Sequence, residues 1–566
     1  MSAGSSQAGD LRQWWAAPLV VVLGGMLPVV VGLQRGTGER DLAFVLQLLL
    51  TAYAGTRLAF VLLRGLTRPL QGAFWLFVYT AMGIAPLAQL VIGQFPTLFV
   101  GTRDHLTTAI LLVLVGCVAF DVAELVVARR RPAASGARGS TDADGAVAAR
   151  VAPAAPSSPR GRAVTGPPSD LRPYRLLVAG SAVALLVSVV LVVRLGGPAT
   201  FFSSRQAISE SIGAAGLADA GSQVGSALLR GGGTMPVLVM LLALTRVLLT
   251  VRPARRSVVL VGTWLALLGA NVVVNNPVSN PRYWALTVLL STVFVLVGAR
   301  RGWYRTVLVG GLVAAVVVFP YADRFRYDEA GYRPLESQSV LTTMAMKDFD
   351  QMVMVANTVT YTQVGEGHTG GRQLLGAVLF FVPRQVWPGK AQDTGVLVGE
   401  WMGTVNTNLS SPWWAELWVD GGWVAVVLGS AALGLAAARA DRRYLVALRR
   451  ARVSDPVLVV VPVVAGYAFI LLRGSLLQAM GRLAILAACG LVLVLWDRQM
   501  RRWSDADEAA PTVAARGAVP SRSVGAARSS GRAEPRSRAA RTHSATALSA
   551  EPSARPQAAP STPPTR

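Results

Sequence analysis

Long apolar stretches alternate with short, arginine-rich polar loops along the first 500 or so residues of this chain. A helix needs about 20 mostly apolar residues to cross ~30 Å of hydrocarbon, and lipid offers no partners for backbone groups outside a helix. The pattern therefore predicts an all-α, polytopic transmembrane helical bundle of about twelve spans. The predicted spans are 17–33, 41–63, 73–93, 106–127, 175–197, 235–252, 257–275, 283–299, 305–320, 421–438, 455–473 and 482–497.

The composition supports membrane insertion and argues against several other classes of protein. Of 566 residues, 52% are hydrophobic and only 15% are charged, whereas about a quarter of the residues of a soluble domain are charged. The net charge of +24 would suggest a nucleic-acid partner in a soluble protein, but here the arginines flank the spans. We predict no nucleic-acid partner. Cys117 and Cys489 lie within apolar spans, which favours small core residues over a disulfide or a metal site.

The cationic loops predict how the chain is oriented. Short loops rich in Lys and Arg stay in the cytoplasm, and five such loops fall on the same side of the predicted bundle: 63–70, 128–132, 251–256, 298–305 and 438–452. Both termini then lie on the inner side of the cytoplasmic (plasma) membrane. Because the polar residues 1–16 lead directly into the first span, we expect the amino terminus to be retained.

Composition also divides the chain into four regions. We expect transmembrane spans in 1–127, a disordered cytoplasmic linker over 128–172, a transmembrane core over 173–502 and a disordered cytoplasmic tail over 503–566. The arginines of the linker and tail would suit anionic membrane lipids, or they could simply be solvated filler.

Three segments fall on the outer side: 198–234, 276–282 and a long external loop, 321–420. Residues 373–387 of this loop are apolar but too short for a span, so they favour a re-entrant or interfacial helix.

The first candidate for chemistry is the connector "NVVVNNPVSNPRYW" (271–284). Helix-breaking polar sequence at a membrane boundary persists only inside protein or beside a wet cavity, so Arg282 is expected to face a cavity. The density of amides favours a turn that contacts a ligand. The alternative is an interfacial turn anchored by Tyr283 and Trp284, with Arg282 reaching to the headgroups.

A second candidate lies within residues 365–403 of the external loop. It offers three cations and three possible bases: Arg372, Arg384, Lys390, His368, Asp393 and Glu400. Cations at a low-dielectric boundary suit a phosphate or diphosphate, although each could also be an ordinary interfacial side chain. Seven residues separate Asp393 from Glu400, which would place both on one face of a helix.

The third candidate is "NTNLSSPWWAELWVDGGW" (406–423). It combines aromatic rings with carboxylates: Trp413, Trp414, Trp418, Trp423, Glu416 and Asp420. Rings stack on the apolar faces of sugars while carboxylates accept hydroxyl protons. An interfacial tryptophan belt explains the rings equally well.

Arg473 and Arg482, at the facing ends of the last two predicted spans, are further candidates. Three other external arginines are weaker candidates because nearby acids could pair with them: Arg205, Arg324 and Arg326.

Together, "NPRYW", "PRQVWPGK", "DTG" and "NLSSPWWAELWVDGGW", followed by two closing spans, resemble the O-antigen polymerase family of oligosaccharide repeat-unit polymerases. The resemblance covers about residues 175–497. It implies a fold related to the GT-C-type membrane glycosyltransferases, an undecaprenyl-diphosphate-linked oligosaccharide as substrate, and no metal or other cofactor. A chain-length regulator and a flippase are the protein partners it suggests.

The resemblance also implies roles for individual residues. Arg282, Arg384 and Lys390 would line the diphosphate and glycan site, and Asp393 or Glu400 would orient or deprotonate the acceptor hydroxyl. From their own chemistry, and not from the resemblance, we expect the remaining candidates to bind substrate: Arg372, His368, Trp413, Trp414, Glu416, Asp420, Arg473 and Arg482.

Three other functions remain open on the sequence. A glycan ligase would use the same donor and differ only in its acceptor. A polyprenyl-phosphate-sugar transferase would resemble its relatives in an acidic pair on a long first external loop, but Glu39 and Asp41 lie in a very short turn. A lipid-oligosaccharide transporter or flippase would place ionisable groups within its spans, where Asp121, Arg246 and Arg57 are the main examples.

Overall fold

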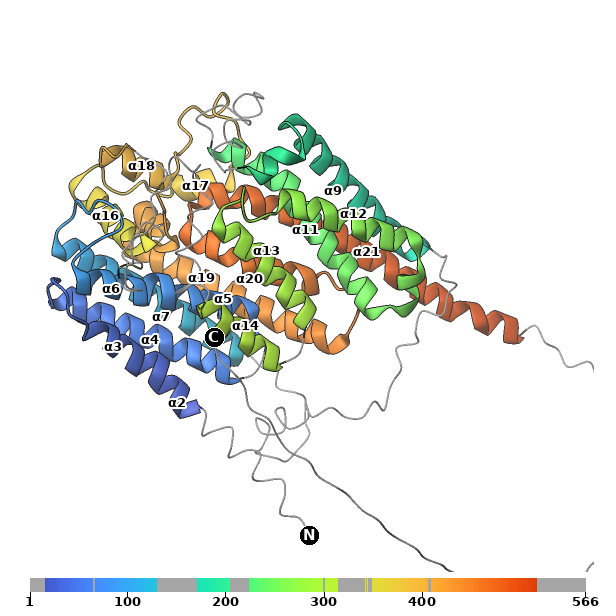
Figure 1. The fold of residues 1–566 in the computed structure, drawn as a ribbon, viewed down its shortest axis with the longest axis horizontal. Helices are drawn as coiled ribbons and strands as arrows, with labels where there is room; N and C mark the ends of the chain where they lie inside the picture. Colours follow the sequence, from blue (N-terminus) through green and yellow to red (C-terminus); the bar gives the residue numbers. More distant parts are fainter. Residues whose placement is uncertain are drawn as a thin grey trace, which may run out of the picture. The chain divides into compact units, whose positions relative to one another are not determined.

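The structure is a computed structural model that describes residues 16–64, 67–129, 171–203, 223–298, 301–313, 342, 344, 349–405 and 409–516. Every regular element within these residues is a helix, and none is a strand, which confirms the predicted all-α class for this part of the chain (Figure 1). The residues up to Asp507 form one compact unit. Of the second unit, from Glu508 onward, the structure describes only the end of the last helix.

The amino-terminal elements form four apolar rods. The first and the third each consist of two α-helices joined by a π-helical turn, and the second and the fourth are single α-helices. The elements are α2 (Ala16–Val20), η1 (Val21–Met26), α3 (Leu27–Gly32), α4 (Leu42–Arg64), α5 (Pro69–Phe77), η2 (Val78–Ile84), α6 (Ala85–Ile92) and α7 (Arg103–Arg129). Every residue from Gln71 to Val91 is buried, so the rod made of α5, η2 and α6 lies inside the bundle.

Two of these rods contain a wide π-helical turn, and in both cases a proline follows it. Pro28 follows η1 and Pro86 follows η2. Proline lacks an N–H, and its ring clashes with the carbonyl oxygen four residues earlier. Just before each proline the backbone follows the π-helical register: the Leu27 amide donates to the Val22 carbonyl oxygen and the Ala85 amide to that of Thr80.

A second group of helices follows the linker. It comprises η3 (Arg172–Tyr174), α9 (Arg175–Arg194), η4 (Pro198–Phe202), α11 (Gln223–Thr250), η5 (Arg252–Arg256), α12 (Val258–Val274), α13 (Arg282–Val297) and α14 (Arg301–Val313). Bulky apolar side chains of α9 remain exposed, among them Val183, Leu186 and Val190. A soluble surface seldom carries such a stripe, whereas lipid accommodates it.

The carboxy-terminal elements carry most of the candidate residues. They are α16 (Gln351–Val364), α17 (Arg372–Val378), α18 (Thr394–Trp401), α19 (Trp413–Arg450), α20 (Val457–Arg473) and α21 (Leu476–Arg516). The α19 helix is broken at Gly421 and Gly422, and Gly422 has a φ of 57°. The predicted span 421–438 therefore begins at the break, and Trp413–Asp420 forms a separate, buried arm.

Seven helices in the described part of the chain are long and apolar enough to cross a membrane. They are Leu42–Leu63, Pro69–Ile92, Arg103–Val127, Arg172–Arg194, Gly231–Thr250, Trp413–Arg450 and Leu476–Asp505. Four shorter apolar helices match further predicted spans: Pro18–Gly32, Val258–Val274, Arg282–Val297 and Val457–Arg473. The chain is thus a helical membrane protein. The predicted span 305–320 overlaps α14, and its residues 314–320 lie outside the described part.

Most of the predicted linker and tail also lies outside the described residues, as do Arg205, Arg324 and Arg326. At the margins that are described, helix extends further than expected. The α7 helix continues to Arg129, and α21 continues to Arg516, into the predicted disordered tail.

The α20 helix connects two hydrophobic cores. Ala465 and Phe469 pack into the core built from α4 to α7 and α19, while Val463 and Tyr467 pack into the core built from α9, α11, α13 and α21. Between these residues Gly466 lies against α13, where an added Cβ would come within 2.7 Å of the Thr287 carbonyl oxygen. At this point the backbones of α13 and α20 lie so close together that there is no room for a side chain between them.

Replacing Gly466 with leucine should therefore lower the melting temperature of the purified protein in detergent. Overpacking at a tight contact costs about 1–3 kcal/mol. The control is Gly262→Leu on α12, where an added Cβ meets nothing within 4 Å. Equal melting temperatures for the two variants would contradict this account of the α13–α20 contact.

Candidate functional site

The α19 arm brings two of the predicted acids into different environments. Glu416 is 4% exposed, and its carboxylate accepts bonds from the Thr394 hydroxyl at 2.9 Å and the Leu476 amide at 3.4 Å. Asp420 accepts the amides of Gln373 at 2.9 Å and Leu374 at 2.6 Å. Asp420 thus caps the start of α17, while Glu416 joins α19 to the starts of α18 and α21.

Asp393 lies next to Glu416 and is also buried. Its carboxylate caps α18 by accepting the Gly395 amide at 3.0 Å, and it accepts the Gln478 side-chain amide at 2.5 Å. Burial raises the pKa of Asp393, although its hydrogen bonds to Gln478 and to the Gly395 amide oppose the shift. The charges of Asp393 and Glu416 interact, so the two form a buried carboxylate pair.

Glu400 does not belong to this pair. It lies at the end of α18 and is exposed, whereas Asp393 at the start of the helix is buried. Seven helical residues place two side chains roughly one above the other, but Asp393 is the N-cap and lies outside the regular helix. The two carboxylates therefore do not share one face of a helix, as their spacing predicted: one is buried and the other is exposed.

The three cations of the predicted external loop all donate hydrogen bonds to its backbone. The Arg372 guanidinium donates to the Gly389 carbonyl oxygen at 3.0 and 2.5 Å. Arg384 donates to the carbonyl oxygens of Lys390 at 2.9 Å and Ala391 at 3.1 Å. The Lys390 ammonium donates to the carbonyl oxygens of Phe380 at 2.6 Å and Val382 at 2.9 Å, and is buried.

These contacts leave the loop strongly positive. Within the described residues, no carboxylate lies within ion-pair distance of Arg372, Arg384 or Lys390. Desolvation and the neighbouring Arg384 charge lower the pKa of Lys390. The predicted re-entrant helix is shorter than expected, since α17 ends at Val378 and turns follow it.

The two closing arginines pack on aromatic rings of the "NPRYW" motif. Arg473 lies 4.9 Å from the Tyr283 ring centroid and pairs with Asp350 at 3.3 Å. Arg482 lies 4.7 Å from the Trp284 ring centroid. Two motifs almost 200 residues apart in the sequence thus form one cluster at the start of α13. Arg282, the first residue of α13, is half-buried beside these rings.

The asparagines of the same turn bind backbone rather than open space. Asn275 donates to the Thr234 carbonyl oxygen at 3.1 Å, Asn276 to that of Phe201 at 2.7 Å, and Asn280 to that of Val274 at 2.8 Å. The expectation that these amides contact a ligand is corrected: they satisfy the backbone of a helix-breaking turn, as its burial requires.

The four predicted tryptophans differ in accessibility: Trp418 is buried, whereas Trp423 is 41% exposed. Trp414 is fully buried and lies 6.2 Å from the Phe74 ring, so it is a core residue. Trp413 is partly buried against the same core.

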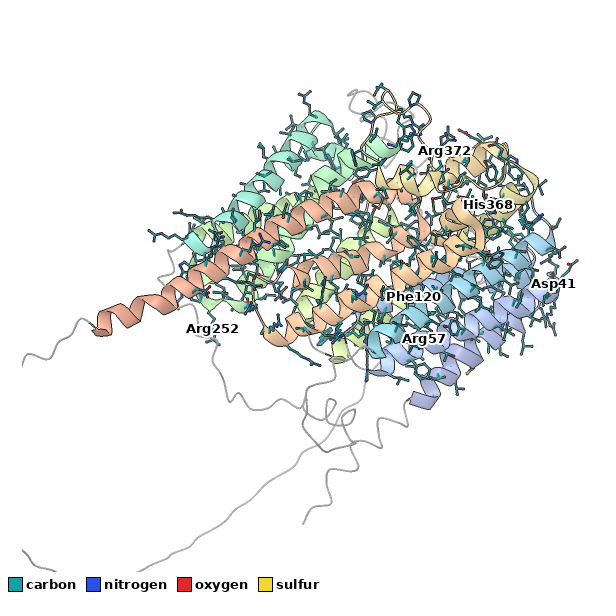
Figure 2. The ribbon with its side chains drawn as sticks, turned by 180° about the vertical axis from the view of Figure 1, so that it is seen from behind. Asp41, Arg57, Phe120, Arg252, His368 and Arg372 are labelled. Carbon is teal, nitrogen blue, oxygen red and sulfur yellow. The ribbon has the colours of Figure 1, made fainter. Side chains whose placement is uncertain are left out.

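His368 is exposed, and its Nδ1 lies 2.8 Å from the Trp418 carbonyl oxygen. Figure 2 shows His368 and Arg372 near one another, at the opposite end of the helices from Arg252.

Three polar residues of the cluster were missed in the sequence: Asp350, Thr394 and Gln478. Gln478 lies inside the stretch that supplied Arg473 and Arg482, so its position near a span end was an available signal. Asp350 carried no such signal, because the helix that follows it, α16, is not apolar enough to be recognised. Within the described residues no group of three metal-binding side chains is found.

A second buried polar cluster lies among α4, α5 and α7. Arg57 pairs with Asp121 at 2.5 Å and with Glu124 at 3.2 Å, and Arg68 pairs with Glu124 at 2.9 Å. The Tyr53 hydroxyl donates to Asp121 at 2.5 Å. Each charge therefore has a partner of opposite sign, as charges inside a helical bundle require.

Comparisons of the chain with protein-family models, with curated proteins and with solved structures find no match. Its function must therefore be argued from its own residues.

The loop cations lead to one prediction about structure. Replacing Lys390 with methionine leaves the carbonyl oxygens of Phe380 and Val382 without their donor, so amide hydrogen exchange over residues 380–391 should accelerate on the order of tenfold or more. The control is Gln385→Met, an exposed change in the same loop. Unchanged exchange in the Lys390 variant would mean that the lysine does not hold the loop.

Proposed function

We propose that this chain is a membrane glycosyltransferase that polymerises undecaprenyl-diphosphate-linked oligosaccharide repeat units into a surface polysaccharide at the outer face of the cytoplasmic membrane. One observation carries the proposal: the short segment 390–394 connects the three cations to the buried carboxylate pair. It contains Lys390, one of the cations, and Asp393, one of the acids, and its Thr394 donates to the other acid, Glu416. Transfer from a lipid diphosphate needs cations for the leaving group and a base for the acceptor hydroxyl. Both lie here within a few residues of one another.

In the proposed reaction, a hydroxyl oxygen of one glycan attacks the anomeric carbon that links the other glycan to its diphosphate. The bond from that carbon to the diphosphate oxygen breaks, and the lipid diphosphate leaves with the electron pair. Arg384 stabilises this developing charge: it is exposed, and its two bonds to carbonyl oxygens leave further N–H groups free to donate. Lys390 holds the loop in position through its bonds to the carbonyl oxygens of Phe380 and Val382.

The hydroxyl proton passes to Asp393. A general base works best when its pKa approaches the working pH, and burial shifts the pKa of Asp393 in that direction. Gln478, in the first turn of α21, orients the carboxylate. Glu416 is the neighbouring member of the pair, and repulsion between like charges disfavours a negative charge on both carboxyl groups at once.

The proposal includes about twelve spans in a GT-C-type arrangement, with both termini cytoplasmic and a chain-length regulator and a flippase as partners. The opposite placement of Arg252 and His368 supports it, because one lies in a predicted inner loop and the other in the predicted external loop (Figure 2). A glycan ligase would use the same donor site, and only the acceptor separates the two activities.

The ion pairs around Arg57 favour a lipid-oligosaccharide transporter as the second candidate, since intramembrane charges often mark transport paths. Purified protein in detergent separates the two functions. A polymerase lengthens a lipid-linked glycan without a membrane to cross, whereas a transporter forms no longer product.

Replacing Arg384 with alanine should lower the rate of this lengthening by about 10²–10³-fold, the usual cost of losing one donor to developing charge. Arg384→Lys should restore little activity, because a point charge lacks the planar guanidinium fork. Gln385→Ala, next to it and exposed, is the control. Near-normal polymer from Arg384→Ala would make the arginine an interfacial anchor.

Replacing Asp393 with asparagine should preserve the fold, since asparagine also caps helices well: its Oδ1 can accept the Gly395 amide, and its Nδ2 can donate to the Gln478 side-chain oxygen once that amide rotates. Transfer at saturating donor should slow by about 10²–10⁴-fold while donor binding is retained. Gln392→Ala, an exposed neighbour, is the control. If Glu400→Gln stops transfer and Asp393→Asn does not, Glu400 is the base instead.

A further inference from the structure

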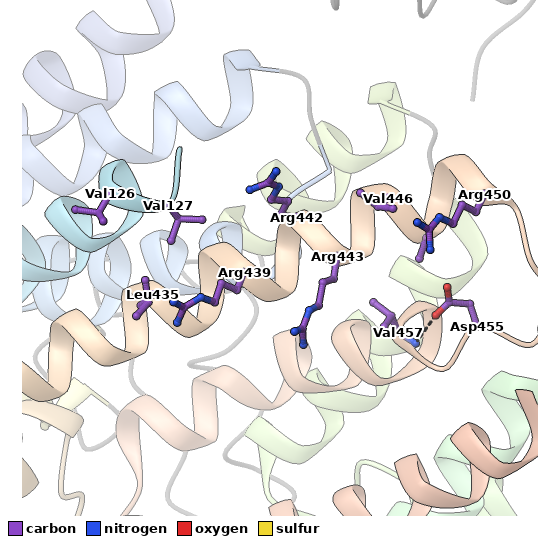
Figure 3. A pocket seen from close by; sticks show the side chains of 11 residues that line it. Val126, Val127, Leu435, Arg439, Arg442, Arg443, Val446, Arg450, Asp455 and Val457 are labelled. Atoms are coloured by element: carbon purple, nitrogen blue, oxygen red, sulfur yellow. Dashed lines mark hydrogen bonds between the residues drawn. The ribbon is translucent and has the colours of Figure 1, made fainter. Parts of the chain in front are cut away.

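A basic groove lies at the end of α19 farthest from the carboxylate pair. It has a volume of about 670 Å³, and its walls come from the end of α7, the end of α19 and the start of α20 (Figure 3). Four arginines of α19 line it: Arg439, Arg442, Arg443 and Arg450. Intervals of three, four and seven residues place side chains along one side of a helix.

The positive charge of this groove is not neutralised by the protein. Within the described residues, none of the four arginines lies within ion-pair distance of a carboxylate. Asp455 is the acidic residue of the lining, and it accepts the Val457 amide at 3.1 Å, at the start of α20 (Figure 3). Arg246 on α11 also interacts with Asp455, which adds a further cation nearby.

Apolar side chains complete the walls and extend beyond them. Val126, Leu435 and Val446 line the groove between the arginines. On α7 the stripe Val118, Val122, Leu125 and Val126 is exposed by 45%, 54%, 46% and 42%. These positions lie on one face of the helix and lead from the groove along a candidate membrane span.

We propose that this groove binds the headgroup of an anionic phospholipid, with an acyl chain lying along the exposed stripe of α7. The guanidinium groups supply bidentate donors for phosphate oxygens, and the adjoining apolar stripe suits a hydrocarbon tail. Basic pockets between membrane helices on the cytoplasmic side commonly hold such lipids. This is also the end of α19 that the cationic loops place in the cytoplasm. The site is separate from the proposed transfer chemistry and does not depend on it.

Native mass spectrometry of the purified full chain in a neutral detergent tests the proposal. Phosphatidylglycerol should remain bound where phosphatidylcholine does not. Each cation near a headgroup contributes about fivefold, so the double variant Arg439→Gln/Arg443→Gln should bind phosphatidylglycerol at least about tenfold more weakly. The charge-matched control is Arg449→Gln/Arg502→Gln, two exposed arginines that do not line the groove.

Two further measurements identify the occupant. Replacing Val122 and Val126 with serine should weaken phosphatidylglycerol binding but leave inorganic phosphate binding unchanged. If inorganic phosphate displaces the lipid completely at millimolar concentration, the groove is a site for a free anion and the lipid assignment is wrong. Equal binding of the two phospholipids, or equal loss in the groove and control variants, would also overturn the proposal.

Discussion

Polar side chains buried among apolar helices must find their partners inside the protein, because neither lipid nor a packed core supplies them. This constraint decides how the ends of the last helices meet. The Glu416 carboxylate accepts from Thr394 at the start of α18 and from Leu476 at the start of α21. One carboxylate on α19 therefore fixes two other helix starts. Asp393 repeats the arrangement through Gly395 and Gln478.

The break in α19 allows one helix to serve two environments. Before the break, the residues from Trp414 to Asp420 are all buried in protein, while Val424 and Leu428 after it are exposed by 69% and 65%, as lipid contact requires. Gly422 has a φ of 57°, where a side chain would be strained. A continuous helix would carry the arm along the axis of the span and away from Thr394 and Gln373. The break therefore holds the acids of the arm at the candidate site.

Hydropathy located most of the apolar helices: eleven of the twelve predicted ranges overlap a candidate span or a shorter apolar helix of the described residues, and the remaining range, 305–320, overlaps α14. It failed for α16, which is buried almost throughout but carries Asn357, Thr358 and Thr360. Protein rather than lipid surrounds this helix, so its polar side chains find partners, as Asn357 does at the Leu98 carbonyl oxygen. A hydropathy pattern predicts helices that lipid surrounds, so it cannot reveal a polar helix that protein surrounds.

The sequence identified which residue types gather near the span ends, but it could not show their partners. Arg473 pairs with Asp350, more than a hundred residues away, and covers the ring of Tyr283. One interpretation of the "NPRYW" motif made its two rings anchors of an interfacial turn, yet both rings pack against arginines of other helices. Such pairs depend on how helices cross, and spacing within one segment carries no information about that.

The two ends of α19 handle charge in opposite ways, and this difference bears on function. Near the break, carboxylates are buried, hydrogen-bonded and close to one another, an arrangement that costs stability. Such a cost is typical of a functional site that needs an acid with a shifted pKa. At the far end, arginines remain exposed along a groove and cost little, because water and headgroups solvate them. Stability alone therefore explains the basic end but not the buried acids, which is why we place the chemistry at the acidic end.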